Sequence, residues 1–367
     1  MDLLNEEITG IKAWILGKYS MNKMPEDGQL KSLLDGYTKE KLMDLSVENG
    51  FEAERRWKKA KLVDYVADCI LESLEERLMI LGKENLQLIQ KKVEGSAGGS
   101  DEVLGFYLRA FPAATRMGLL FSFENEDGMV SYISDEVKEK IGEVVRDFTR
   151  LEQKYANQLR FWKTIEDLIH AAIALYGVVS KGTIYDLWEI YDTKIKKVDV
   201  EEQLSIMGPL FYYIPLIAMR NNFYVVKGYL LGSDLLDNEE KVDIFYGHLP
   251  DRSQLAIYKP TKGDLNEYIK HAFDRRSTYY KKLKRLISKQ QLHIPFHNMM
   301  RYIETNIQLG KTLTVLTNDI KKMGMMLFRT PKDLEKFALY YMDLVNHSRM
   351  WQLRGHTPVE ARKMMAE

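Results

Sequence analysis

The chain has 367 residues, of which 45% are hydrophobic and 29% are charged, a composition typical of globular proteins with two to four domains. Lys and Arg number 53, as do Asp and Glu, so the formal net charge is zero and contact with nucleic acid would have to rest on local patches. The lone cysteine, Cys69, excludes a disulfide framework and a cysteine-based zinc site. The most apolar stretch, residues 209–219, is too short for a membrane span, and the amino terminus lacks a signal peptide, so we expect a cytoplasmic protein that does not bind membranes.

The first predicted elements are short helices. An amphipathic helix is expected over residues 3–19, followed by a linker over residues 22–28. Thr38 is a candidate N-cap of the next helix. Asn49 and Gly50 end that helix, because both residue types tolerate the left-handed conformation of a C-cap.

A long amphipathic helix is predicted to begin near Trp57 and to end near Lys92. Its buried stripe recurs every four residues: Leu62, Val66, Ile70, Leu74 and Leu78. Cations crowd the start of this helix: Arg55, Arg56, Lys58, Lys59 and Lys61.

Two helices around an extended loop, followed by the run KKAKLVDYV, resemble the N-terminal domain of transcription termination factor Rho and related SAP-like modules over residues 29–70. The resemblance implies nucleic-acid contact through basic residues near the second helix. The corresponding residues here are Arg55, Arg56, Trp57, Lys58, Lys59 and Lys61. The alternative is a small helical cap whose basic edge is simply solvated.

A winged-helix-like unit is predicted over residues 101–158, after a flexible joint at residues 94–100. A helix over 101–111 is followed by two strands, over 117–123 and 129–133, that flank a hairpin signal. Ser134 is expected to cap a helix that continues to Tyr155.

A second winged-helix-like unit is predicted over residues 160–250. Thr164 and Asp167 suggest a capping box for a helix that Gly177 ends, and two further helices and a hairpin wing follow over residues 178–231. Pro209 and Pro215 are expected to bend or break the third helix. That helix opens with Asp199, Glu201 and Glu202, which would repel phosphate, so this unit is predicted to scaffold or to bind protein.

The last predicted domain covers residues 261–367 and is helical. Thr261 and Asp264 start a helix expected to carry residues 274–289, a window with seven bases and one acid. The bases, with two interleaved aromatics, could hold a phosphate backbone and stack on nucleobases. These residues are Arg275, Arg276, Tyr279, Tyr280, Lys281, Lys282, Lys284, Arg285 and Lys289. The alternative is an ordinary exposed face above Leu283, Leu286 and Ile287.

Residues 346–358 resemble the region that precedes the metal-binding motif of bacterial SEC-C proteins, some of which carry a Rho-N-like domain. In that family the downstream motif binds zinc through clustered Cys and His, and such cysteines are missing here, so the zinc role is not transferred. The segment would be a helical platform whose polar and aromatic residues are either structural or face a partner. These residues are Arg349, Trp351, Arg354 and His356.

No catalytic or cofactor motif emerges. His293 and His297 have the spacing of a helical metal pair, but Pro295 disrupts the geometry. Gly310-Lys311-Thr312 echoes the end of a phosphate-binding loop without its first glycine or preceding strand. We therefore expect no metal, no cofactor and no catalytic residues.

The sequence thus predicts a mainly α, multi-module fold with small winged-helix-like units and short β-hairpins, divided into residues 1–93, 101–158, 160–250 and 261–367. The predicted function is non-enzymatic binding of DNA or RNA for a regulatory purpose. An adaptor or inhibitor in a phage or anti-phage context, whose basic patches meet an acidic protein surface, is the alternative. An enzyme with an unrecognised site is a third option.

Overall fold

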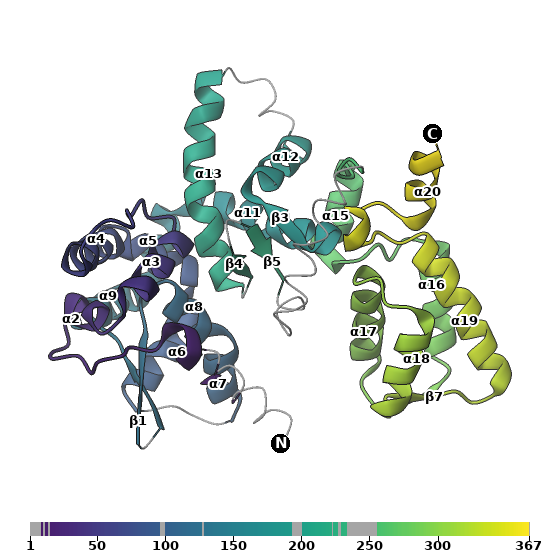
Figure 1. The fold of residues 1–367 in the computed structure, drawn as a ribbon, viewed down its shortest axis with the longest axis horizontal. Coiled ribbons are helices and arrows are strands. Elements are labelled where there is room, and N and C mark those ends of the chain that lie inside the picture. The colour runs from purple at the N-terminus through teal and green to yellow at the C-terminus, as the bar shows by residue number, and fades with distance from the viewer. Residues whose placement is uncertain are drawn as a thin grey trace. The chain divides into compact units, whose positions relative to one another are not determined.

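The computed structural model describes residues 9, 12–13, 15–95, 100–126, 128–192, 200–221, 223–226, 229–232 and 255–366. The chain is mainly helical with small antiparallel sheets, as predicted (Figure 1). It forms two compact units: unit 1 comprises Met1–Glu166 and Leu204–Lys227, and unit 2 comprises Asp167–Gln203 and Gly228–Glu367. Residues 160–250 are therefore shared between both units, and the four-module division stays a prediction.

Several predicted features lie outside the described residues. They are residues 1–8, 10, 11 and 14 of the first helix, residues 96–99 of the joint, Asp127, Asp199, the side chains of Glu201 and Glu202, Asn222, Lys227 and Gly228.

Unit 1 is built from short helices and one hairpin. Its elements are α2 (Leu30–Asp35), α3 (Lys39–Glu48), α4 (Lys59–Glu72), α5 (Leu74–Leu81), α6 (Lys83–Val93), α7 (Ser100–Gly105), the π-helical turn η1 (Phe106–Ala110), α8 (Phe111–Arg116), β1 (Phe121–Asn125), β2 (Gly128–Tyr132), α9 (Asp135–Arg146), α10 (Phe148–Lys154) and β4 (Tyr224–Val226). Two helices, α11 (Ala156–Tyr176) and α13 (Val200–Arg220), begin in one unit and end in the other.

Both predicted ends of α3 are confirmed. The Thr38 hydroxyl accepts a hydrogen bond from the Lys41 amide, and Asn49 closes the helix before Gly50, whose φ is 72°. Within α3, Leu42 and Leu45 are buried, whereas Val47 is exposed.

The long helix predicted from Trp57 to Lys92 is wrong, because the chain breaks twice. Ser73 turns away from helical geometry, and its hydroxyl donates to the Cys69 carbonyl at 2.7 Å. Gly82 has φ 85°, which ends α5 before α6 begins. The predicted apolar stripe is nevertheless buried along α4 and α5: Leu62, Val66, Ile70, Leu74 and Leu78.

The hairpin of unit 1 is confirmed, with Asn125 opposite Gly128 in the register of β1 and β2. The first strand was predicted to start at residue 117. It starts at Phe121 instead, and helix α8 occupies the chain up to Arg116. Ser134 caps α9 by accepting from the Val137 amide. The single helix predicted after Ser134 is two helices, α9 and α10, divided at Asp147.

Helix α11 begins earlier than predicted. Thr164 lies inside the helix and is no N-cap; its hydroxyl donates to the Arg160 carbonyl at 3.0 Å. Gly177, with φ 74°, ends the helix as predicted. Helix α13 is not broken, since it continues through Pro209 and Pro215.

Unit 2 contains the remaining elements: β3 (Val178–Ser180), α12 (Lys181–Tyr191), β5 (Tyr229–Leu231), α15 (Lys262–His271), α16 (Thr278–Ile287), β6 (Gln291–Leu292), α17 (Phe296–Gln308), α18 (Leu313–Lys322), β7 (Met326–Leu327), α19 (Pro331–Asn346), the 3₁₀ turn η5 (Trp351–Leu353) and α20 (Pro358–Ala366). Strand β3 pairs antiparallel with β5, and β6 pairs antiparallel with β7.

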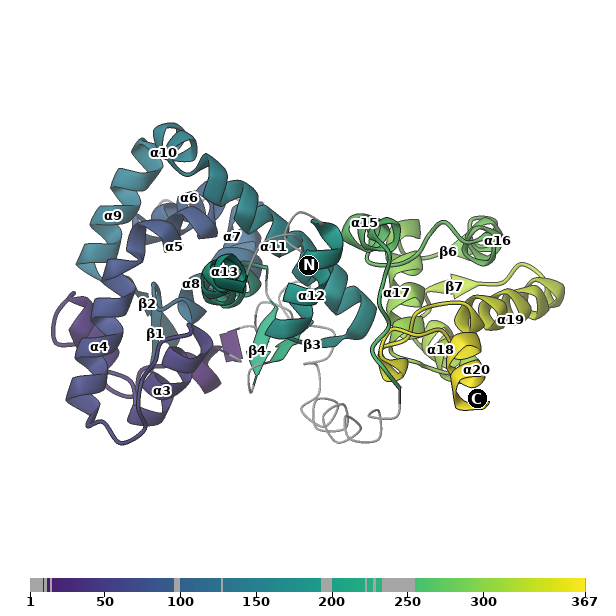
Figure 2. The same ribbon diagram turned by 90° about the horizontal axis from the view of Figure 1, so that it is seen from above.

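One core joins four helices of unit 2. Helix α19 packs along α16, and α17 and α18 contribute to the same buried cluster (Figure 2). The single helix predicted from Thr261 through Lys289 is wrong. Helix α15 ends at Ala272, whose φ is 56°, and α16 starts anew with Ser277 as N-cap. Across the described ranges, no helix combines the length and apolarity that crossing a bilayer requires.

Candidate nucleic-acid interface

The N-terminal basic patch comprises the cations of residues 55–61, and neighbouring carboxylates neutralise part of its charge. The Arg56 guanidinium lies 2.5 Å from the Glu54 carboxylate, and the Lys59 ammonium lies 2.9 Å from the Asp35 carboxylate. Surface ion pairs of this kind contribute little stability but lower the local positive field.

Trp57, the aromatic residue of this patch, is also engaged. The Lys61 ammonium lies 4.1 Å from the centroid of the Trp57 ring, and Tyr65 meets the same ring edge-on at 5.0 Å. Arg55 and Lys58 are exposed, and no ion pair holds either of them among the residues that the structure describes. The patch therefore offers Arg55, Lys58 and the ammonium of Lys61 to a ligand.

The C-terminal patch comprises the cations of residues 275–289, and its first two arginines bind carboxylates of unit 2. Arg275 binds the Glu304 carboxylate through Nε at 2.9 Å and Nη2 at 2.8 Å. The Tyr280 hydroxyl donates to the same carboxylate at 2.8 Å. Burial raises the pKa of the Tyr280 hydroxyl, and its hydrogen bond to Glu304 adds to the shift. This bidentate arrangement ties the loop before α16 to α17.

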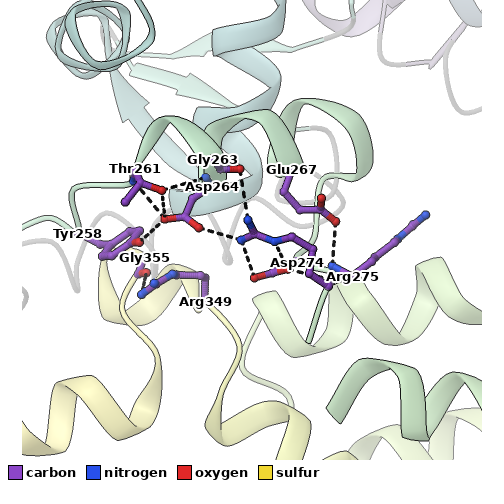
Figure 3. Close-up of polar contacts among 10 residues, drawn as sticks. Tyr258, Thr261, Gly263, Asp264, Glu267, Asp274, Arg275, Arg349 and Gly355 are labelled. Atoms are coloured by element: carbon purple, nitrogen blue, oxygen red, sulfur yellow. Dashed lines mark hydrogen bonds and ion pairs between the residues drawn. The ribbon is translucent and has the colours of Figure 1, made fainter. Parts of the chain in front are cut away.

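Arg276 belongs to a second internal cluster, at the start of α15. Figure 3 labels Thr261, Asp264 and Asp274 of this cluster. Its guanidinium donates to Asp274 and Asp264, and these hydrogen bonds raise the pKa of Arg276. Burial alone would raise the pKa of Asp264, but hydrogen bonds from Arg276, Thr261 and Tyr258 outweigh it and lower that pKa to about 2. Asp264 therefore stays ionised and holds the helix start together.

Helix α16 presents the accessible part of the C-terminal patch. Tyr280, Leu283, Leu286 and Ile287 point into the core. The helix itself carries no acidic residue, and the remaining cations are exposed with no ion pair among the described residues. They are Lys281, Lys282, Lys284, Arg285 and, just beyond the helix end, Lys289.

The four cations within α16 span an arc of about 160° around the helix axis at 3.6 residues per turn. Tyr279, which was expected to stack on bases, lies flat against His347 instead, with ring centroids 4.1 Å apart. The interface of α16 is thus a row of cations with little free aromatic surface.

Near the C-terminus, the four residues that could face a partner make contacts with other residues of unit 2. Arg349 stacks on the Tyr258 ring at 3.4 Å and pairs with Glu360. The Trp351 indole donates to the Ala174 carbonyl at 3.0 Å, and the ring is buried.

The other two hold the chain segment before α15. Arg354 donates to the Leu255 carbonyl at 2.8 Å, and the His356 Nε2 lies 2.9 Å from the Ala256 carbonyl. The four residues therefore stabilise the internal packing of unit 2.

The two histidines that have the spacing of a helical metal-binding pair, His293 and His297, lie in different surroundings. His293 Nδ1 lies 2.9 Å from the Gly324 carbonyl, while His297 is exposed at the start of α17. Within the described ranges, no three His, Cys, Asp or Glu side chains gather where they could hold a metal ion.

Sequence reasoning passed over a third group of exposed cations, around α17 and α18. These are Arg301, Lys321, Lys322, Arg329 and Lys332. They are dispersed along the sequence and make no charge run: Arg301 lies on α17, Lys321 and Lys322 on α18, Arg329 after β7, and Lys332 at the start of α19.

No protein-family model, curated protein or solved structure matches this chain.

Proposed function

We propose that this protein is a non-enzymatic nucleic-acid-binding protein that holds the phosphate backbone with the exposed face of α16. The observation that carries the proposal is the set of five accessible cations at Lys281, Lys282, Lys284, Arg285 and Lys289, with no acidic residue on the helix. Cations whose carboxylate partners are absent remain available to phosphate, and releasing counterions from the nucleic acid then drives binding.

The N-terminal patch is the second contact in this proposal. Arg55, Lys58 and Lys61 are the cations among residues 55–61 that are exposed and have no ion pair among the described residues. Because the formal net charge is zero, neither patch benefits from a global positive field. Binding should accordingly be governed by these local contacts and should weaken steeply with salt.

The test is a salt titration of binding to labelled duplex DNA, single-stranded DNA and RNA, followed by fluorescence anisotropy. The variant carries Lys281→Ala, Lys282→Ala, Lys284→Ala and Arg285→Ala. The matched control removes four exposed cations that already have carboxylate partners: Lys23→Ala, Lys31→Ala, Lys138→Ala and Arg150→Ala.

Each phosphate contact contributes about 0.9 to the slope of log affinity against log salt for duplex DNA, so the α16 variant should lose up to about 3.6 units of slope. The control variant has the same net charge as the α16 variant, because each loses four cations. It should nevertheless keep the wild-type slope. Equal slopes for the α16 variant and the wild type would overturn the proposal.

A protein partner is the second candidate, and one observation favours it. Helix α19, which packs against α16, exposes Leu339 by 64% and Met342 by 54%. Exposed apolar side chains near cations are typical of protein interfaces, and nucleic acid gains little from them. If this candidate is right, Leu339→Ser with Met342→Ser abolishes capture of an acidic protein and leaves nucleic-acid affinity unchanged.

A further inference from the structure

Helices α17 and α18 are joined by a tight four-residue turn, residues 309–312. Gly310 has φ 73°, and a β-carbon there would lie 2.7 Å from the Gln352 side chain. The Lys311 amide donates to the Asn306 carbonyl at 2.9 Å, and the Thr312 hydroxyl caps α18 by accepting from the Val315 amide. The turn has the length and the glycine that are typical of a helix-turn-helix.

The surrounding elements complete such a unit. Leu316 and Ile320 anchor α18 in the core that it shares with α16, α17 and α19. Strands β6 and β7 pair antiparallel, with Gln291 opposite Leu327, so the chain order is helix, strand, helix, turn, helix, strand. Both ribbon views place α17 and α18 side by side (Figures 1 and 2).

The outward face of α18 has the chemistry of a helix that reads bases. Its exposed residues fall within an arc of about 120° at 3.6 residues per turn. They are Thr314, Val315, Asn318, Lys321 and Lys322. An asparagine amide can pair with the N6 and N7 of adenine, threonine and valine methyls can contact the thymine methyl, and lysine can reach guanine or phosphate.

Cations outnumber carboxylates in the segment that contains α18. From residue 296 to residue 333 each of the three carboxylates has an internal partner: Glu304 binds Arg275, Asp319 binds Tyr302, and Asp333 binds Thr330. Five cations in the same segment are exposed, without an ion pair among the described residues: Arg301, Lys321, Lys322, Arg329 and Lys332. Exposed cations therefore outnumber exposed carboxylates in this segment, although the exposed Glu335 follows directly after it, and this excess favours a polyanionic partner.

We infer that α18 is a recognition helix that enters the major groove of duplex DNA, with Asn318 contacting a base edge and Lys321 and Lys322 contacting phosphates. This inference rests on the proposed function and narrows it from nucleic acid to double-stranded DNA. It also separates the two roles: the α16 cations hold the backbone, and the α18 face provides sequence preference.

The experiment starts with selection of preferred sites from a randomised duplex DNA library by the wild-type protein. Affinities for the selected duplex, a scrambled duplex and the corresponding single strand are then measured for Asn318→Ala and for Lys321→Ala with Lys322→Ala. Gln87→Ala and Lys336→Ala, exposed helical positions on α6 and α19, are the matched controls. Circular dichroism confirms that each variant is folded.

Asn318→Ala should weaken binding to the selected duplex about 10-fold and leave the scrambled duplex unchanged, since one bidentate base contact is lost. The double lysine variant should weaken both duplexes and reduce the salt slope by about 2 units. Neither control should change either property.

The inference is overturned if the wild type selects no site or if both α18 variants bind duplex DNA like the wild type. The proposed function survives that result when the quadruple α16 variant still loses affinity and slope. Conversely, loss of binding in the α18 variants alone would support the recognition helix and move the backbone contact away from α16.

Discussion

Arg275 and Arg285 provide a direct test of how the structure divides the C-terminal cations. Both are arginines of the same charge run, ten positions apart. Arg275 binds the buried Glu304, whereas Arg285 is exposed on α16. We predict that Arg275→Ala destabilises the α16–α19 core and that Arg285→Ala does not.

The magnitude follows from burial. Removing one partner of a buried ion pair costs about 3–5 kcal/mol. The Glu304 side chain is 6% exposed but that of Arg275 is 36% exposed, so water already screens the arginine end and the lower part of the range applies. We expect Arg275→Ala to lower the free energy of unfolding by about 2–3 kcal/mol, and Arg285→Ala to change it by less than about 0.5 kcal/mol.

Hydrogen exchange read peptide by peptide suits a chain with two compact units, because it isolates the core of α16–α19. A loss of 2 kcal/mol should speed exchange of the most protected α17 amides by about 30-fold. Arg285→Ala should instead weaken binding to nucleic acid without this change. Equal exchange rates in the two variants would refute the structural role of Arg275.

Two further tests concern backbone and pH. Gly177→Ala should lower the free energy of unfolding by about 2 kcal/mol, because its φ is 74° and the new β-carbon would lie 2.7 Å from the Trp351 ring. In contrast, Gly142→Ala within α9 meets no atom within 4 Å and should raise it by about 0.5–1 kcal/mol; thermal unfolding measures both changes. The folded-state pKa of Asp264 is about 2, below its ordinary value of 3.8, so its stabilisation is present above pH 4 and is lost as the pH falls toward 2. Solvent screens this partly exposed carboxylate, so Asp264→Asn should lower the free energy of unfolding at pH 7 by about 1 kcal/mol and flatten the acid-dependent loss, as urea unfolding at a series of pH values would show.

Features decided by neighbouring residues were predictable from the sequence. Side chains or backbone angles within a few positions decide the N-caps at Thr38 and Ser134, the helix stop at Gly177 and the hairpin in which β2 begins at Gly128. The mainly helical class follows from the same local periodicity.

Features decided by distant residues were not predictable. The charge run at 274–289 looks uniform, yet Glu304, far along the chain, converts Arg275 into a structural residue. Ala272 takes a left-handed conformation that its residue type does not favour, and this ends a helix expected to continue. Pro209 shows the reverse case, since α13 continues through a residue that usually interrupts helices.

The same physics explains why two surfaces of unit 2 would be needed for a specific function. Contacts to phosphate alone typically give dissociation constants of about 10⁻⁴ to 10⁻⁶ M at physiological salt. Charges separated by more than about 8 Å are largely screened there, so the α16 cations act only on contact and carry no sequence information. The base contact assigned to Asn318 would contribute a preference of about 10-fold for one site, which phosphate contacts cannot supply. If the proposed function holds, sequence preference would therefore come from base contacts of the α18 face, added to the phosphate contacts of α16.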